Sequence, residues 1–77
     1  MSYFVKFESP SKQQVLYRTP AGSWVGPLAF EKAEHFKNLH QAVEVCKQMS
    51  VPKSMRAGMM VVNSLGSQFF HLIPRAV

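Results

Sequence analysis

The segment from Phe30 to Cys46 holds the side chains best suited to chemistry, because two of the three histidines and the only cysteine fall within it. These residues could ligate a metal ion, or a histidine could activate the cysteine as a nucleophile. Structural zinc sites use closely spaced pairs such as C-x-x-C or H-x-x-x-H, and the chain contains neither spacing. In a helix, His40 and Cys46 would point about 240° apart around the axis. We therefore expect no metal and no cofactor.

Cys46 belongs to a stripe of apolar residues with helical spacing, which comprises Leu39, Ala42, Val43, Cys46 and Met49. A reactive cysteine needs exposure and a neighbouring base or helix N-terminus that lowers its pKa. A place in the middle of an apolar stripe instead predicts a small buried side chain that faces the rest of the protein. The chain also has no aspartate and no glycine-rich phosphate loop. The sequence therefore predicts a protein that is not an enzyme, in which this helix is scaffold.

The helix that carries this stripe has clear limits. Asn38 is a good N-cap, and Pro52 disfavours helical geometry at the preceding residue, so the helix should end near Ser50. Runs of β-branched and aromatic residues predict two strands before the helix, at 3–8 and 14–18, and two after it, at 59–63 and 68–73. The order ββ-α-ββ predicts an α+β fold, with a small antiparallel sheet of about four strands packed against one amphipathic helix. We expect a single compact domain over residues 1–77.

The last two predicted strands are apolar on both sides. Strict alternation would place Met59, Val61, Phe69 and Ile73 on one face of the sheet, and Met60, Val62, Phe70 and Leu72 on the other. An antiparallel sheet with one solvated face normally alternates apolar and polar side chains. One helix covers one face only, so the segment 19–36 must cover the second face or leave it free for a partner. An uncovered face or strand edge would also suit a homodimer.

The charge of the chain is uneven along its length. The formal net charge is +5 at pH 7, and Glu44 is the last acidic residue. Four cations follow it without a balancing carboxylate, at Lys47, Lys53, Arg56 and Arg75. A basic half of this kind is attracted to polyanions or to acidic protein surfaces.

The compartment follows from features that the sequence lacks. A single cysteine cannot form an internal disulfide, which is typical of a reducing environment. The first residues have no signal-peptide pattern, and no run approaches the roughly 18 to 20 apolar residues of a membrane span. We expect a cytoplasmic protein with no membrane segment.

Several residues are candidates for a binding surface. Trp24, in a turn rich in glycine and proline, could anchor a partner, and Met55 lies in a methionine-rich segment suited to adaptable contacts. The loop after the helix presents two cations beside small residues. We predict partner contacts at Trp24, Met55, Lys53 and Arg56, and contacts to a polyanion at Lys47 and Arg75. Two alternatives stay open: the methionines fill the core, and Trp24 folds back over the sheet.

A small basic nucleic-acid-binding protein is the alternative function. Aromatic side chains of the predicted sheet could stack bases beside basic residues, as in other single-strand binders; they are Tyr3, Phe4, Tyr17, Phe69 and Phe70. However, the chain has no RNP-like aromatic pattern and no recognition helix with a basic face. The sequence therefore favours a protein partner over a nucleic acid.

The layout YFVKFE … VLYRTPAGSWVG … KAEHFKNLHQAVEVC … MVVNS resembles a pattern found in many small bacteriophage and prophage proteins. In those proteins, a hairpin that ends in a turn with tryptophan is followed by A-x-x-F, a helix cap and a helix with an apolar stripe. Ala33 and Phe36 occupy the A-x-x-F positions here, Asn38 the cap, and Ala42 and Val43 the start of the helix.

This resemblance implies an accessory or host-takeover protein that binds a host component. Anti-CRISPR proteins belong to this class, and many of them mimic DNA with acidic surfaces, whereas this chain is basic. The resemblance therefore implies an inhibitor or accessory factor that occludes a host protein or defence complex in the host cytoplasm by another mechanism.

Overall fold

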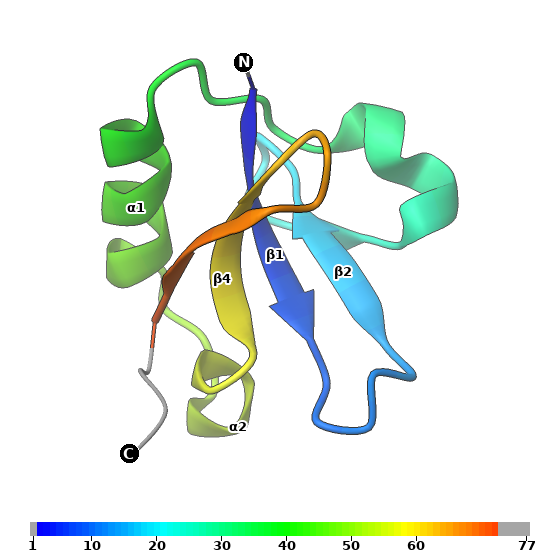
Figure 1. Ribbon diagram of the computed structural model, residues 1–77. Helices are drawn as coiled ribbons and strands as arrows, with labels where there is room; N and C mark the ends of the chain where they lie inside the picture. The colour runs from blue at the N-terminus through cyan, green and yellow to red at the C-terminus, as the bar shows by residue number, and fades with distance from the viewer. Residues whose placement is uncertain (1, 73–77) are drawn as a thin grey trace.

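The computed structural model describes residues 2–72 as one antiparallel sheet with a helix packed on one face and a shorter helix on the other (Figure 1). Along the chain, the elements are β1 (Tyr3–Glu8), β2 (Val15–Arg18), β3 (Trp24–Val25), η1 (Pro27–Lys32), α1 (Leu39–Gln48), α2 (Lys53–Arg56), β4 (Met59–Asn63) and β5 (Gln68–His71). The predicted α+β fold is confirmed, with antiparallel strands before and after one principal helix.

Three short elements lie outside the predicted pattern: β3, the 3-10 helix η1 and the single-turn helix α2. The sheet consequently has five strands rather than about four. Helix α1 ends at Gln48, two residues before the predicted stop, because Met49 already has extended backbone angles. Strand β5 ends at His71, so Leu72 lies outside the strand contrary to the prediction, and Ile73 lies outside the described residues.

The order of strands in the sheet is β3-β2-β1-β4-β5, so β1 is central. Lys6 of β1 lies opposite Tyr17 of β2 on one side and Met60 of β4 on the other. Neighbouring side chains in a strand point to opposite faces. The register therefore places Lys6 and Met60 on one face of the sheet. The neighbouring pairs, Val5 with Val61 and Phe7 with Met59, lie on the other face.

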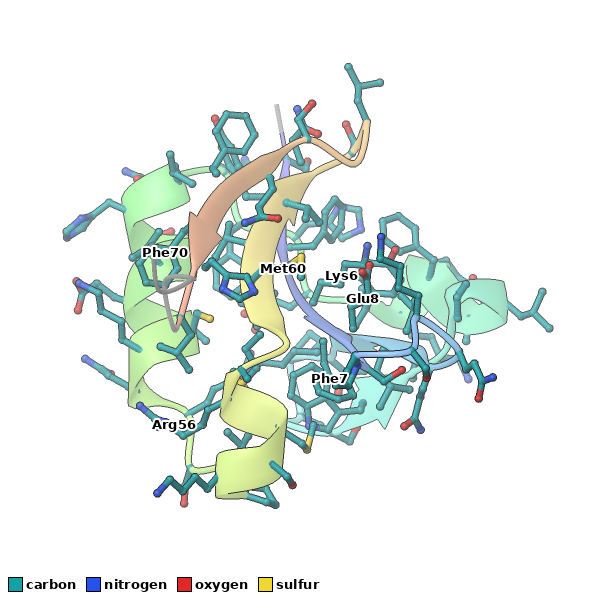
Figure 2. The ribbon with its side chains drawn as sticks, turned by 60° about the horizontal axis from the view of Figure 1, so that its bottom comes forward. Lys6, Phe7, Glu8, Arg56, Met60 and Phe70 are labelled. Atoms are coloured by element: carbon teal, nitrogen blue, oxygen red, sulfur yellow. The ribbon has the colours of Figure 1, made fainter. Side chains whose placement is uncertain are left out.

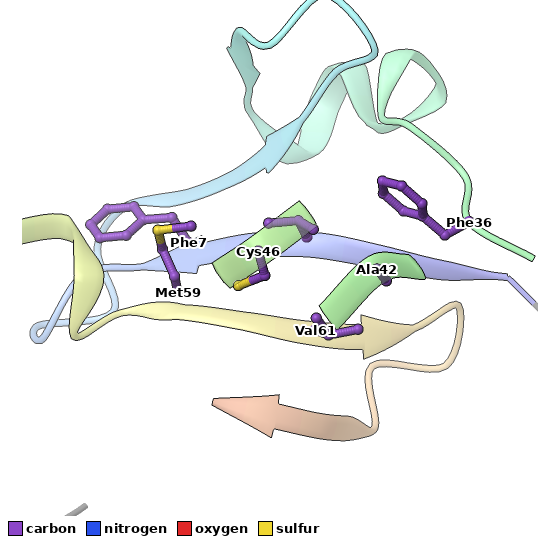
Figure 3. Close-up of a cluster of buried hydrophobic side chains, with 7 residues drawn as sticks. Phe7, Phe36, Ala42, Cys46, Met59 and Val61 are labelled. Atoms are coloured by element: carbon purple, nitrogen blue, oxygen red, sulfur yellow. The ribbon is translucent and has the colours of Figure 1, made fainter. Parts of the chain in front are cut away.

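Helix α1 packs on the face that carries the odd-numbered residues of β1 and β4. Figure 3 shows Ala42 and Cys46 of α1 above these strands, beside Met59 and Val61. All four side chains are fully buried, and the burial of Ala42 and Cys46 confirms the prediction from the apolar stripe. The predicted cap is confirmed as well, because the Asn38 side chain accepts a hydrogen bond from the His40 amide at 2.7 Å. This cap satisfies one of the free amides at the start of the helix.

The opposite face is covered only in part. A second core cluster of Phe4, Ala33, Met60 and Val62 lies there, and Tyr17 and Phe30 pack against it. The Phe30 ring of η1 lies 4.6 Å from that of Phe4 and 4.7 Å from that of Tyr17. Phe30 and Ala33 of the segment 19–36 therefore cover this face above β1 and β2, whereas Trp24 and Phe36 pack on the α1 face. Helix η1 makes its main strand contacts with β2 and β3.

The predicted faces of the last strand were wrong beyond its first residues. Val62 pairs with Gln68, but Val61 pairs with Phe70, so β5 contains one extra residue at a bulge. A bulge of one residue exchanges the faces of all later side chains. Phe70 and Leu72 consequently pack against the core cluster beneath α1. The other face of β5 receives Gln68 and His71, and it is polar rather than apolar.

Candidate functional site

The uncovered half of the second sheet face forms a hollow of about 540 Å³. Its lining comes from β1, the β1–β2 turn, β4, the β4–β5 turn and β5: Lys6, Glu8, Lys12, Met60, Val62, Gly66, Gln68 and His71. Met60 and Val62 contribute apolar side chains to this lining, and both are buried. Pockets of this volume commonly hold a drug-sized ligand or a short segment of a partner.

A second hollow, of about 310 Å³, continues the first toward the other end of the strands. The two hollows share Lys6, Val62 and Gly66, and the second one adds Tyr17, Phe30 and the residues of the β4–β5 turn. Together they form one sheet groove that runs from Lys12 to Leu65. The groove has η1 on one side and the β4–β5 hairpin on the other.

The register of the sheet brings the polar residues of this groove together. Lys6 and Glu8 alternate along β1 and therefore share a face, where their side chains form an ion pair of 3.2 Å (Figure 2). Met60 lies between Lys6 and His71, since it pairs with both across neighbouring strands. Lys12 enters from the tight β1–β2 turn, in which it has a positive φ of 61°.

The far end of the sheet groove is built around Asn63. The Asn63 side-chain oxygen accepts hydrogen bonds from the amides of Leu65 at 3.0 Å and Ser67 at 2.8 Å, which fixes the β4–β5 turn. Gly66 completes this turn with a φ of +87°, a conformation that favours glycine. The turn projects Leu65 into solvent, where it is 83% exposed.

The predicted partner-binding residues lie elsewhere on the molecule. Trp24 and Met55 are half-buried and pack against the core cluster on the α1 face, so both have a structural role there. Lys53 and Arg56 belong to α2, which lies at the end of the sheet near the β1–β2 turn (Figure 1). The structure does not bring these residues into the sheet groove, and nothing described tests whether they contact a partner.

The two residues predicted to contact a polyanion do not line the groove among the described residues either. Lys47 is exposed on α1, lies 3.9 Å from Glu44 and approaches the ring of Phe70 at 5.8 Å. Figure 2 shows Phe70 beside this helix. Arg75 lies outside the described residues.

The two histidines and the cysteine of the segment 30–46 do not come together in one site. Cys46 is fully buried on the side of α1 that faces the sheet. This burial raises the pKa of its thiol from 9.0 to about 11, although the positive charge of Arg56 lowers it. His35 is exposed and packs edge-on against the Phe4 ring at 4.8 Å, on the other face of the sheet. Within residues 2–72, no three histidine, cysteine or acidic side chains are gathered as metal ligands would be.

Tyr17 was the one groove residue predicted from the sequence as a possible contact, and the polar residues of the groove were not predicted. A signal was available for Lys6 and Glu8, because they alternate with Val5 and Phe7 and so mark a polar side of β1. No comparable signal existed for His71, since the bulge determines which face it occupies.

Comparison with protein-family models, with curated proteins and with solved structures finds no match to this chain. None of the helices in residues 2–72 is long and apolar enough to cross a bilayer.

Proposed function

We propose that the chain is a non-enzymatic protein-binding module whose partner docks in the sheet groove. The observation that carries this proposal is the half-covered face of the sheet, where η1 reaches β2 and β3 but leaves the surface above β4 and β5 hollow. An open, elongated groove with a polar lining and an exposed apolar end suits a segment of another protein.

The groove has few side chains that are suited to catalysis. Its charged side chains in the first hollow are an ion-paired lysine and glutamate and one further lysine, Lys12. The only thiol is on the opposite face, and its raised pKa keeps it protonated at neutral pH. Binding without turnover is the simpler role for such a surface.

The resemblance to small bacteriophage proteins suggests which class of partner the groove binds. We propose an inhibitor or accessory factor that occludes a host protein or defence complex in the cytoplasm. Steric occlusion requires only a stable surface of the right shape, which a small domain with a groove can supply.

A nucleic-acid partner is the second candidate, and the cations outside the groove favour it. Lys53 and Arg56 on α2 have no carboxylate within ion-pair distance among residues 2–72. Against this, the sheet lacks a free stacking platform on its open face, because Phe4 and Tyr17 already pack with Phe30. We therefore rank it below a protein partner.

An affinity capture with and without nuclease tests the choice. The tagged protein is incubated with bacterial lysate beside two variants that add the same bulky side chain, Gln68→Trp within the groove and Gln41→Trp on the exposed side of α1. We expect a discrete protein to be retained after nuclease treatment by the wild type and Gln41→Trp, but not by Gln68→Trp. Retention that disappears with nuclease would support the nucleic-acid alternative, and equal retention by both variants would exclude the groove.

A further inference from the structure

We propose that the sheet groove binds an extended acidic segment of the partner, in which an apolar residue lies about five positions from a carboxylate. This inference rests on the proposed function and names the chemistry of the segment that the groove takes. It follows from the different character of the two ends of the groove and from the distance between them.

One end of the groove is positively charged. Lys6 and Lys12 line the first hollow, and Glu8 is the one carboxylate among the described residues that line it. The ion pair between Lys6 and Glu8 offsets one positive charge, which leaves the exposed Lys12 as a positive charge in excess. An entering carboxylate is attracted to this end, whereas a basic segment is repelled.

The other end of the groove is apolar. Leu65 is exposed at the tip of the β4–β5 turn, and it lines the second hollow together with the aromatic residues Phe30 and Tyr17. A large apolar side chain that is exposed beside aromatic rings can bury area with a partner. Two backbone amides of the turn are already satisfied, because the Asn63 side chain accepts hydrogen bonds from Leu65 and Ser67. This end therefore selects an apolar side chain rather than a hydrogen-bonding one.

The length of the groove sets the spacing of the two features. Strand β1 spans the groove from Tyr3, opposite Asn63, to Glu8, which precedes the turn with Lys12. Five residue steps at about 3.3 Å cover about 17 Å. An extended peptide advances by a similar amount per residue, so it spans the same distance in about five positions. A compact ligand could not contact both ends.

The test is a titration of the isotope-labelled protein with synthetic peptides, followed by two-dimensional amide NMR. All peptides are acetylated at the N-terminus and amidated at the C-terminus, so that only side chains carry carboxylates. The peptide LSGSGEE has the required spacing, LSGSGQQ lacks the carboxylates, and LEESGSG has the same composition with the leucine beside the glutamates. We expect LSGSGEE to shift the amides of Gly66, Gln68 and His71, and the other two peptides to bind at least about threefold more weakly, as exposed single contacts are modest.

Matched charge reversals identify the groove as the site. Lys12→Glu should weaken binding of LSGSGEE by about tenfold, because an attraction becomes a repulsion, whereas Lys37→Glu, an exposed lysine that does not line the groove, should change it by less than about twofold. Leu65→Ser should weaken it by about three- to tenfold through lost apolar contact.

Equal binding of LSGSGEE and LEESGSG, or equal losses in Lys12→Glu and Lys37→Glu, would overturn the inference. So would the absence of any shift with LSGSGEE. If the peptide fails while Gln68→Trp alone abolishes protein capture, the proposed function stands and only the chemistry assigned to the segment is wrong. If capture fails as well, the proposed function falls with it.

Discussion

Gly58 and Glu8 are in close backbone contact where β1 meets the turn before β4, and the Glu8 amide donates a hydrogen bond to the Gly58 carbonyl at 2.9 Å. A Cβ atom on Gly58 would clash with the Glu8 carbonyl oxygen and lie only 2.9 Å from Cε1 of Phe7. The absence of a side chain at position 58 thus allows α2 and β4 to close against the end of β1. The same contact fixes Glu8 at the edge of the sheet groove.

Gly58→Ala should lower the free energy of unfolding by about 1–3 kcal/mol, because backbone must move to admit the methyl group. Gly26→Ala is the matched control, since its φ is −77° and no atom lies within 4 Å of the added Cβ. That variant should be neutral or slightly more stable. Urea unfolding measures both, and equal stabilities for the two variants would contradict the close approach.

Asn63→Ala should also destabilise the protein, by about 1–3 kcal/mol, because the buried side chain accepts two backbone amides of the β4–β5 turn. The exposed neighbour provides the control, and Ser64→Ala should change stability by less than about 0.5 kcal/mol. Hydrogen exchange separates the local effect from the global one. In Asn63→Ala, the amides of Leu65 and Ser67 should exchange faster relative to those of β1, and uniform acceleration would argue against a local turn anchor.

The parts of this fold that follow a regular period could be predicted from the sequence. The stripe from Leu39 to Met49 identified α1 and its buried face, and Asn38 identified its start, because both depend on local spacing and local hydrogen bonds. The strands β1 and β4 were placed for the same reason.

The candidate site could not be predicted, because it depends on pairing between distant segments. The bulge opposite Val61 and Val62 changes the face of Phe70 and His71, and nothing within QFFH shows that the extra residue is there. The coverage of the second face depends on how Phe30 meets Phe4 and Tyr17, which are far apart in the chain. Trp24 and Met55 drew attention by residue type, but type alone does not show that they pack on the core.

Glu34→Gln should lower the free energy of unfolding by about 1–3 kcal/mol. Glu34 forms an ion pair with Arg18, whose side chain is only 18% exposed, so the change leaves a largely buried charge without its counterpart. The exposed pair of Lys47 and Glu44 is the control, because Glu44→Gln removes an ion pair whose side chains are 51% and 42% exposed. The control should lose less than about 0.5 kcal/mol in urea unfolding. Similar losses in both variants would mean that burial does not set the strength of the Arg18 pair.

Cys46 should make the stability fall at high pH. The folded state raises the pKa of the thiol from 9.0 to about 11 through burial, so the unfolded chain loses the proton first as the pH rises. The contribution is therefore complete below pH 9 and declines between pH 9 and 11. Urea unfolding at pH 8 and at pH 10.5 measures it, with Cys46→Ala as the reference that retains every other titration. Parallel pH dependences in the two proteins would show that the thiol does not contribute.

Glu8→Gln should strengthen binding of the peptide LSGSGEE by about threefold. The change removes the one carboxylate among the described residues of the first hollow, so Lys6 becomes available to the peptide and a repulsion disappears. The change should also lower the free energy of unfolding by about 1–3 kcal/mol, since the two side chains are only 17% and 24% exposed and Lys6 is left without its counterpart. Glu31→Gln, on the exposed surface of η1, makes the same change in net charge away from the first hollow. NMR titrations of both variants at low and high salt decide between a local and a global cause. Enhanced binding by Glu8→Gln alone assigns the effect to the groove, whereas equal enhancement that vanishes in high salt would assign it to net charge.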